Sequence, residues 1–430
     1  MESNPPVGIE FSLTLKGLHS PACAGIERID RIYADHFLRQ SSRGCCAVVQ
    51  SWPRPAFLSR QQAQTVLRRR EALAADAAVE DAGFISLCAR LFRESSPTPS
   101  KPAVGRAADW RNFLLACALR LPMRKVTTLP RGSVYLNVSQ HHLFSSKSYR
   151  WLDKRGDLIK IFMLHDLLPL DYPEYWEAGH RARFDRSVDF VARRAPALIT
   201  PPEGGRRRIA REMRQRGRDG IPIHVAPFPS PLAGLRPPDA ALVEKLKAAR
   251  YFLMIGTIEP RKNHLLILHL YRALAHSGAA APRLVLVGGR GWENEQVLDL
   301  VERCESLRDR VIEVSNLSPT ALACLIGGAN ALLVPSFDEG YGLPIVEALT
   351  LGVPVVASNR ETFREVSQGC ATFIDPTDGP GWTQALIDLG DAGSAASSRA
   401  GKQAAGFSSP EWSGYFHSLE KFIATLRTVA

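Results

Sequence analysis

The sequence predicts an α/β protein built on a parallel, doubly wound sheet, and two observations favour this class. From residue 251 to residue 357, short apolar runs alternate with amphipathic stretches, the pattern of strands joined by helices. The chain has 430 residues, which is enough for two ordinary domains with separate cores. In such sheets, ligands bind beyond the carboxyl ends of the strands, so the loops there are the candidate site.

The N-terminal half has weaker signals. A strand is expected over 8–15, and a helix over 25–38, where apolar residues recur at helical spacing. The Pro- and Ser-rich stretch 95–107 predicts a loop. Short apolar runs predict buried strands at 134–138, 159–164, 197–200 and 223–226.

A domain boundary is expected between residues 227 and 238, where five prolines disfavour both helix and central strand. We therefore expect an N-terminal domain of residues 1–228, a C-terminal domain of residues 239–408 and a final helix within residues 409–430. In the C-terminal domain, strands are predicted at 251–256, 283–287, 311–314, 331–334 and 353–357. The helices between them are predicted at 263–276, 293–305, 318–327 and 344–351.

The composition is that of a globular protein, with 45% hydrophobic and 23% charged residues. No apolar run reaches the roughly 18 residues of a membrane-spanning helix. The N-terminus lacks a basic start followed by an apolar stretch, so no secretory signal is expected. The eight cysteines are scattered without metal-type spacing and are interpreted as reduced thiols. We expect a cytoplasmic protein, with the inner face of the cytoplasmic membrane as the more specific location.

The net charge of +11 favours phosphate-rich partners. Arginines cluster at residues 68–70 and again between residues 206 and 218. Two interpretations stand equal: a solvated helix face, or a dock on anionic lipid headgroups at roughly 1 kcal/mol per Arg. Nucleic acid is not expected, because no aromatic residues interleave with these arginines.

The strongest chemical signal is the segment 334–356, VPSFDEGYGLPIVEALTLGVPVV. A strand ends, a loop with Glu339 follows, and Pro344 opens a helix with Glu347 in its first turn. Loop glycines allow close approach of backbone N–H groups, and a helix N-terminus suits a phosphate. Glu347 is placed for a vicinal diol such as a ribose, and Glu339 for a second polyol. The segment predicts a nucleotide-sugar site; the structural alternative is an acidic pair that only stabilises the helix.

A second segment, LMIGTIEPRKN at 253–263, follows another predicted strand. The strand ends at Gly256, and the loop after it carries Arg261 and Lys262. Cations at a strand's carboxyl end suit the charge that develops on a leaving diphosphate. The alternative is a capped surface turn with solvated charges.

These segments resemble the donor domain of glycosyltransferase family 4, a family of retaining enzymes with the GT-B fold. The resemblance rests on GTIEPRKN, PSFDEGYGLPIVEAL, LGVPVVASN and FREVSQGCATFIDP, and on the spacing of Glu339 and Glu347. It implies two Rossmann-like domains facing each other across a cleft. It also implies that the last helix, around residues 412–426, crosses back to the N-terminal domain.

The resemblance implies roles for individual donor-side residues. Glu339 would contact the hydroxyls of the donor sugar and act in catalysis, and Glu347 would hold the ribose. Arg261 and Lys262 would bind the diphosphate. The remaining donor-side positions would line the sugar and phosphate site: Gly256, Gly340, Tyr341, Gly342 and Leu343. Family members commonly have Phe at the position of Tyr341.

On the acceptor side, MLHDLLPLDYPEY at 163–175 resembles the loop that brings a histidine to the reaction centre. His165 would be that catalytic residue, with Asp166 orienting it; the alternative for a lone histidine is a structural role. Gly25 and Arg28 lie in GIER, which resembles the glycine-containing turn near the acceptor site. His141 and His142 have no further ligand at metal spacing, so no metal is expected.

The resemblance therefore implies transfer of a hexose from a nucleotide diphosphate sugar to a saccharide, with no cofactor and no metal. GTIEPRKN and HDLLPL look most like segments of bacterial mannosyltransferases and rhamnosyltransferases of surface polysaccharide assembly. This makes GDP-mannose the first choice and UDP-glucose or another hexose donor the second. The expected acceptor is a saccharide or a polyprenyl-diphosphate-linked saccharide. A protein that binds a nucleotide sugar without turnover is the alternative from another class, and a GT-B epimerase or phosphorylase is the alternative among enzymes.

Overall fold

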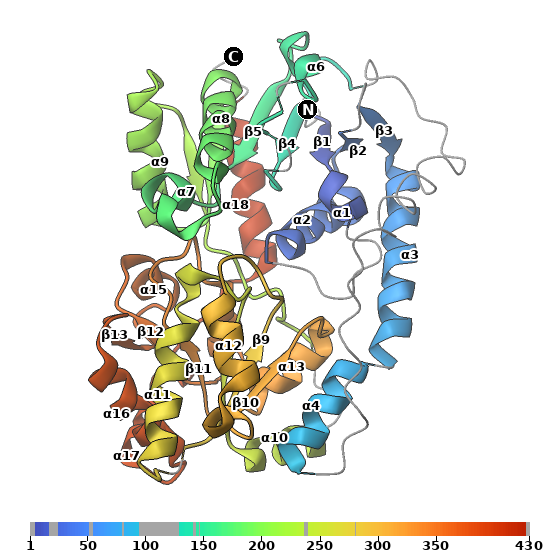
Figure 1. Cartoon of the computed structure of the whole chain (residues 1–430). Helices are drawn as coiled ribbons and strands as arrows, with labels where there is room; N and C mark the ends of the chain where they lie inside the picture. Colours follow the sequence, from blue (N-terminus) through green and yellow to red (C-terminus); the bar gives the residue numbers. More distant parts are fainter. Residues whose placement is uncertain are drawn as a thin grey trace.

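The structure is a computed structural model of the whole chain (Figure 1). It describes residues 5–16, 25–50, 55–79, 81–93, 129–140, 143–145, 147–235, 240–279 and 281–426. The predicted loop 95–107 and the histidines at 141 and 142 lie outside these ranges.

The N-terminal half contains a seven-stranded sheet in the order β3-β2-β1-β4-β5-β6-β7. Neighbouring strands are parallel except for β3, which pairs antiparallel with β2 at the sheet edge. The strands are β1 (Val7–Glu10), β2 (Cys45–Val49), β3 (Ala56–Ser59), β4 (Val134–Asn137), β5 (Ile159–Met163), β6 (Ala197–Thr200) and β7 (Ile223–Val225).

The C-terminal half contains a six-stranded sheet that is parallel throughout, in the order β10-β9-β8-β11-β12-β13. The order reverses at β8, which creates the crevice where ligands of doubly wound sheets bind. The strands are β8 (Tyr251–Ile255), β9 (Arg283–Val287), β10 (Val311–Val314), β11 (Ala331–Val334), β12 (Val355–Ser358) and β13 (Thr372–Ile374).

Helices cover both faces of each sheet, as parallel sheets require. One buried cluster packs the N-terminal sheet against its helices on one face, a second does the same for the C-terminal sheet, and a third is shared between the two halves. The helices of the N-terminal half are α1 (Ser12–Lys16), α2 (Gly25–Asp35), η2 (His36–Gln40), α3 (Arg60–Val79), α4 (Ala82–Phe92), α6 (Arg150–Asp153), α7 (Leu168–Asp171), η4 (Pro173–Tyr175), α8 (His180–Arg194) and α9 (Glu203–Gln215). Those that follow are α10 (Ala240–Ala249), η5 (Pro260–Lys262), α11 (His264–His276), α12 (Glu295–Arg303), η6 (Glu305–Leu307), α13 (Pro319–Gly327), α14 (Leu343–Thr350), α15 (Glu361–Val366), α16 (Gly379–Gly390), α17 (Ala395–Ala405) and α18 (Trp412–Thr425).

The strands and helices predicted from residue 251 to residue 357 are confirmed at nearly the same residues. The strand predicted over 8–15 is wrong in its second half, because β1 ends at Glu10 and α1 begins at Ser12. The Glu10 carboxylate accepts a hydrogen bond from the Ser12 N–H at 2.9 Å, which satisfies a free donor of the first helical turn.

Two segments connect the halves at a distance from the linker. α3 leaves the N-terminal sheet beside β2 and β3 and leads to α4, which packs against β10 and α10 (Figure 1). The Asp81 carboxylate caps α4 and also accepts from the Ser318 N–H before α13. At the chain end, α18 packs on α2: the hydroxyls of Tyr33 and Tyr415 meet, and Glu420 pairs with Arg43 at 2.7 Å. The domain boundaries placed at residues 228 and 239 stay predictions.

The described part of the linker, residues 226–235, contains neither helix nor strand. None of the helices in the described residues combines the length and apolar character that crossing a membrane requires. The cysteines that lie in the described ranges carry free thiols: Cys45, Cys46, Cys88, Cys304, Cys324 and Cys370.

Candidate functional site

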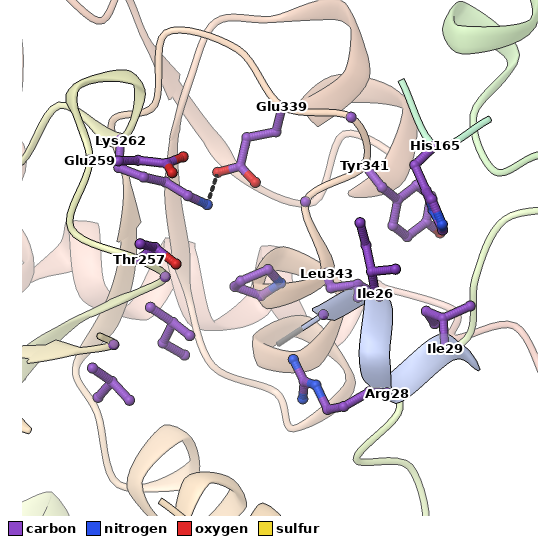
Figure 2. Close-up of a pocket in the computed structure, with 18 of the residues that line it drawn as sticks. Ile26, Arg28, Ile29, His165, Thr257, Glu259, Lys262, Glu339, Tyr341 and Leu343 are labelled. Carbon is purple, nitrogen blue, oxygen red and sulfur yellow. Dashed lines mark hydrogen bonds and ion pairs between the residues drawn. The ribbon is translucent and has the colours of Figure 1, made fainter. Parts of the chain in front are cut away.

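A cavity of about 510 Å³ lies between the two halves, where loops after β5, β8, β9 and β11 converge. Nearly all the residues predicted for the site line it, from both halves of the chain (Figure 2). They are Gly25, Arg28, His165, Asp166, Gly256, Arg261, Lys262, Glu339, Gly340, Tyr341, Gly342 and Leu343. Glu347 is the predicted residue that does not line the cavity.

The centre of the cavity wall is an ion pair between the two predicted motifs. Lys262 Nζ donates to Glu339 Oε1 at 2.7 Å, and the same oxygen accepts from the Ser336 hydroxyl at 2.7 Å (Figure 2). Burial would raise the pKa of Glu339, but attraction by Lys262 and Arg261 outweighs it and leaves that pKa below its usual value. Glu339 is therefore an anion, and Lys262 presents a cation to the cavity.

Arg261 is fixed beside this pair. Its Nη1 donates to the Asp338 carbonyl at 2.7 Å, and its Nη2 donates to the Glu259 carboxylate. Its buried Nε–H has no partner. Because the guanidinium is held on two sides, it approaches an anion in the cavity at little further entropic cost.

Two glycines leave room for these close approaches. Gly256 has a φ of +143°, and a Cβ there would lie 2.9 Å from Cε of Lys262, so any side chain would displace the lysine. A Cβ on Gly340 would lie 2.3 Å from Oδ2 of Asp166, which belongs to the opposite half of the chain. The absent side chain at Gly340 thus lets the loop after β5 touch the loop after β11.

The loop and helix N-terminus after Gly340 form the floor of the cavity. Gly342 precedes α14 with a φ of +94°, and Leu343 opens the helix. The Tyr341 hydroxyl donates to the Phe228 carbonyl in the linker at 2.9 Å, a bond that the family's usual Phe cannot make. The change to Tyr therefore ties the linker to the site.

Glu347 lies behind this floor, fully buried, and is covered by Arg28. Arg28 Nη1 is 2.5 Å from Glu347 Oε1, with poor angles for a hydrogen bond, so that neither carboxylate oxygen has a well-aligned donor. Burial raises the pKa of Glu347, and Arg28 opposes that rise. The structure therefore pairs a residue predicted for the acceptor with one predicted for the donor.

His165 lines the cavity from the acceptor side. Its Nε2 lies 2.8 Å from the Val138 carbonyl, so this nitrogen is the donor and Nδ1 carries the lone pair. Burial lowers the pKa of His165 to about 4, and the ring is neutral at pH 7. The Asp166 carboxylate accepts a hydrogen bond from the Leu168 N–H at 3.0 Å, and its orienting of His165 stays a prediction. Burial raises the pKa of Asp166.

Several lining residues were not predicted from the sequence. Most follow the carboxyl ends of β8, β9 and β10, where the rule for doubly wound sheets already pointed. Trp176 comes from the acceptor side and stacks on Trp292 at 5.4 Å between ring centroids. The unpredicted lining residues include Thr257, Glu259, Gly288, Gly289, Asn316, Leu317, Pro319 and Trp176.

The arginine cluster at the start of α9 meets the opposite half of the chain. Arg207 pairs with Glu361 on α15, and Arg208 pairs with Asp338 at 3.2 Å and with Asp171. The Glu365 carboxylate accepts the first N–H groups of α9, from Glu203 at 2.5 Å. Arg207 and Arg208 thus act between the halves, whereas Arg214 and Arg216 pair with carboxylates of their own half.

Within the described ranges, no group of three or more His, Cys, Asp or Glu side chains is gathered for a metal ion.

Comparison with known protein families gives a match to the model "Glycosyl transferases group 1" over residues 241–387. The chain carries a glycosyl transferases group 1 domain. This confirms the family resemblance for the segment that contains Arg261, Lys262, Glu339 and Glu347. The group 1 domain covers β8 to β13 and the cavity wall that the loops after β8, β9 and β11 form.

Among curated proteins, the chain is 41% identical over 129 residues to the O-antigen chain mannosyltransferase B of Escherichia coli, covering 30% of this chain and 33% of that protein. It is 30% identical over 225 residues to the serotype-specific mannosyltransferase WbdA of Escherichia coli, covering 50% of this chain and 27% of that protein. The matches thus span about a third or less of these relatives.

Solved structures resemble the whole chain. A sucrose-phosphate synthase from Thermosynechococcus elongatus aligns over 99% of this chain and 100% of its own, with a TM-score of 0.61 and 15% identity. Anabaena Alr3699/HepE, solved with UDP and glucose, aligns over 99% and 100% with a TM-score of 0.57 and 15% identity. At this identity the likeness shows the fold alone, and the fold is GT-B, as expected from the sequence.

Proposed function

We propose that the chain is a retaining glycosyltransferase that moves a hexose from a nucleotide diphosphate sugar to a saccharide or lipid-linked saccharide during surface polysaccharide synthesis. The observation that carries this proposal is the Lys262–Glu339 pair beside Arg261 in a group 1 domain, at a cavity lined from both halves of a GT-B fold. Cations and a carboxylate in one cavity fit a ligand that has both a diphosphate and hydroxyl groups.

On the donor side, Arg261, Lys262 and the N-terminus of α14 would hold the diphosphate and stabilise its charge as it leaves. Glu339 would accept hydrogen bonds from hydroxyls of the sugar, and Glu347 from the ribose. The diphosphate oxygens would compete with Glu339 for Lys262, which frees the carboxylate to turn to the sugar. Retention of configuration would follow attack from the face on which the diphosphate departs.

On the acceptor side, His165, Gly25 and Arg28 line the same cavity. Because His165 is neutral with a lone pair on Nδ1, it would accept a hydrogen bond and orient a hydroxyl rather than donate a proton. Asp166 lies against Gly340 and would help to hold the two halves together around the substrates. Catalysis would need neither metal nor cofactor.

Mannose is the favoured sugar, with GDP-mannose as donor, because the relatives named above are mannosyltransferases. UDP-glucose is the second candidate. The acceptor would be a saccharide carried on a polyprenyl diphosphate, which fits the net charge of +11.

The test combines a thermal-shift screen of GDP, UDP, ADP and dTDP, and of their common sugar conjugates, with an assay of nucleotide release in the presence of acceptor saccharides. The proposal predicts stabilisation by one nucleotide series and acceptor-dependent release of that nucleotide. Stabilisation by a nucleotide sugar without release for any acceptor would favour the non-catalytic binding protein. No stabilisation by any nucleotide would overturn the proposal.

A further inference from the structure

Arg28 covers Glu347, the residue that is proposed to hold the ribose of the donor. Its side chain lines the cavity, whereas Glu347 does not, and Figure 2 shows Arg28 beside the start of α14. Glu347 is fully buried and Arg28 is 8% exposed, so their 2.5 Å contact closes the carboxylate off from the cavity.

The pair is close but incompletely satisfied. Arg28 Nε and Nη1 and both Glu347 oxygens are buried without a well-aligned hydrogen-bond partner. A buried carboxylate in that state is costly, because its desolvation is not repaid by hydrogen bonds. A vicinal diol offers two O–H donors, one for each oxygen, and so satisfies Glu347 better than Arg28 does.

The surrounding backbone holds Arg28 in this place. A Cβ on Gly25 would lie 3.2 Å from Cδ1 of Leu343, so the first turn of α2 sits directly on the first turn of α14. α2 is in turn fixed by α18, through Tyr33 and Tyr415. Because Arg28 already lines the cavity, its guanidinium can leave Glu347 by swinging into that cavity.

We propose that Arg28 is the counter-ion of Glu347 in the empty enzyme, and that the ribose diol of the donor displaces it. This inference rests on the proposed function, because it requires a nucleotide in the cavity. Donor binding then exchanges one ionic contact for two hydrogen bonds and releases Arg28 from the donor-side helix. The exchange couples ribose recognition to a residue of the acceptor-side half.

The coupling is measurable as the contribution of the diol to affinity. In wild type, that contribution is reduced by the cost of separating Arg28 from Glu347. Without Arg28, no ion pair has to be broken before the diol binds Glu347. The full contribution of the diol to nucleotide affinity is then measured. The readout is the ratio of the Kd for 2′,3′-dideoxy-GDP to the Kd for GDP, with the corresponding uridine pair measured in parallel.

The experiment compares wild type with Arg28→Met and Arg28→Gln, each first checked for cooperative thermal unfolding. We expect the ratio to rise about fivefold or more in both variants, a coupling of ordinary size for groups in contact. Glu347→Gln should lower the ratio below that of wild type. The matched control is Arg39→Met, because Arg39 follows on the same segment and pairs with Asp35 and Glu71 away from the cavity.

An unchanged or lower ratio in both Arg28 variants would overturn the inference and leave the proposed function standing. Loss of cooperative unfolding in both variants would also overturn it, since Arg28 would then be required for the fold. Wild type that binds neither GDP nor UDP would instead show that the proposed function has failed.

Discussion

The two motif glutamates are in contrasting states: Glu339 lines the cavity, and Glu347 is fully buried behind it. Glu339 receives Lys262 and Ser336 at hydrogen-bonding distance, and its pKa lies below the usual value. Glu347 is covered by a single guanidinium with poor geometry, and burial raises its pKa. The partners of Glu339 belong to its own half of the chain, whereas the partner of Glu347 comes from the other half.

The difference teaches that the surroundings of Glu339 are formed within the group 1 domain, while those of Glu347 depend on how the two halves meet. Preformed charges bind with little rearrangement. When the partner of a carboxylate lies on the other half, its contacts instead depend on how the two halves are arranged. Substitutions around Glu339 should therefore act within one half of the chain, whereas substitutions around Glu347 should act on the contact between the halves.

The largest effect is expected from Glu339→Gln. Because Glu339 would bond the sugar, its loss should lower kcat by about 10²- to 10³-fold. Affinity for the nucleotide diphosphate without sugar should change less than about threefold. Steady-state kinetics and calorimetry measure the two quantities, with Glu313→Gln, which only loses a surface pair with Arg290, as control. An equal loss in both quantities would contradict a sugar-specific role.

His165 should lower the stability of the protein in acid. Its pKa is about 4 in the folded protein and about 6.5 when unfolded, so the unfolded chain takes up the proton first as pH falls. The free energy of unfolding of wild type should therefore fall between pH 6.5 and pH 4, by up to about 3 kcal/mol relative to His165→Gln. Urea titrations across this range measure it. Parallel curves for the two proteins would contradict the burial of a neutral His165.

The contact between the halves at Gly340 is tested by Gly340→Ala. Because a Cβ would lie 2.3 Å from Asp166, the variant should lose about 1–3 kcal/mol of stability. It should also lose about tenfold in kcat/KM, since a small displacement at a site is costly. Gly401→Ala on α17, where a Cβ meets nothing within 4 Å, is the control. Equal unfolding midpoints for both variants would contradict the close approach.

The smallest effect is expected from Tyr341→Phe. The change removes one buried hydrogen bond to the Phe228 carbonyl and should cost about 1 kcal/mol of stability. Activity should stay within about twofold of wild type, because the hydroxyl bonds to the linker at the Phe228 carbonyl. Tyr271→Phe, which loses a bond to the Pro282 carbonyl away from the cavity, should behave alike. A tenfold loss of kcat/KM in Tyr341→Phe alone would place the hydroxyl in the reaction instead.

The sequence predicted much of this fold because the second sheet is parallel and buried. Its strands are continuous apolar runs, and the loops after β8 and β11 carry the charged and glycine residues directly at the strand ends. β1 was predicted too long because the prediction rested on the hydropathy pattern. That pattern does not show that the Glu10 carboxylate accepts a hydrogen bond from Ser12 and so favours a helix start there. β2 and β3 were missed, and so was α4, whose partner β10 lies far along the chain.

The sequence predicted which residues form the site, but not which of them contact one another. Lys262 and Glu339 were assigned to one donor site because each follows a predicted strand of the same domain, and the structure shows that these strands, β8 and β11, are neighbours. The pairing of Arg28 with Glu347 depends on how two halves of the chain meet, and a local pattern carries no information about that. Trp176 was missed for the same reason, because its partner Trp292 comes from the other half.

The most direct test of the central claim is calorimetric titration of Lys262→Met with GDP and UDP and their sugar conjugates, beside wild type. The control is Lys247→Met, whose lysine pairs with Glu244 on the surface of α10. The account predicts saturable binding of one nucleotide series by wild type and control, and binding about 100-fold weaker in Lys262→Met. Equal binding by all three proteins, or none by wild type, would contradict a diphosphate site at Lys262.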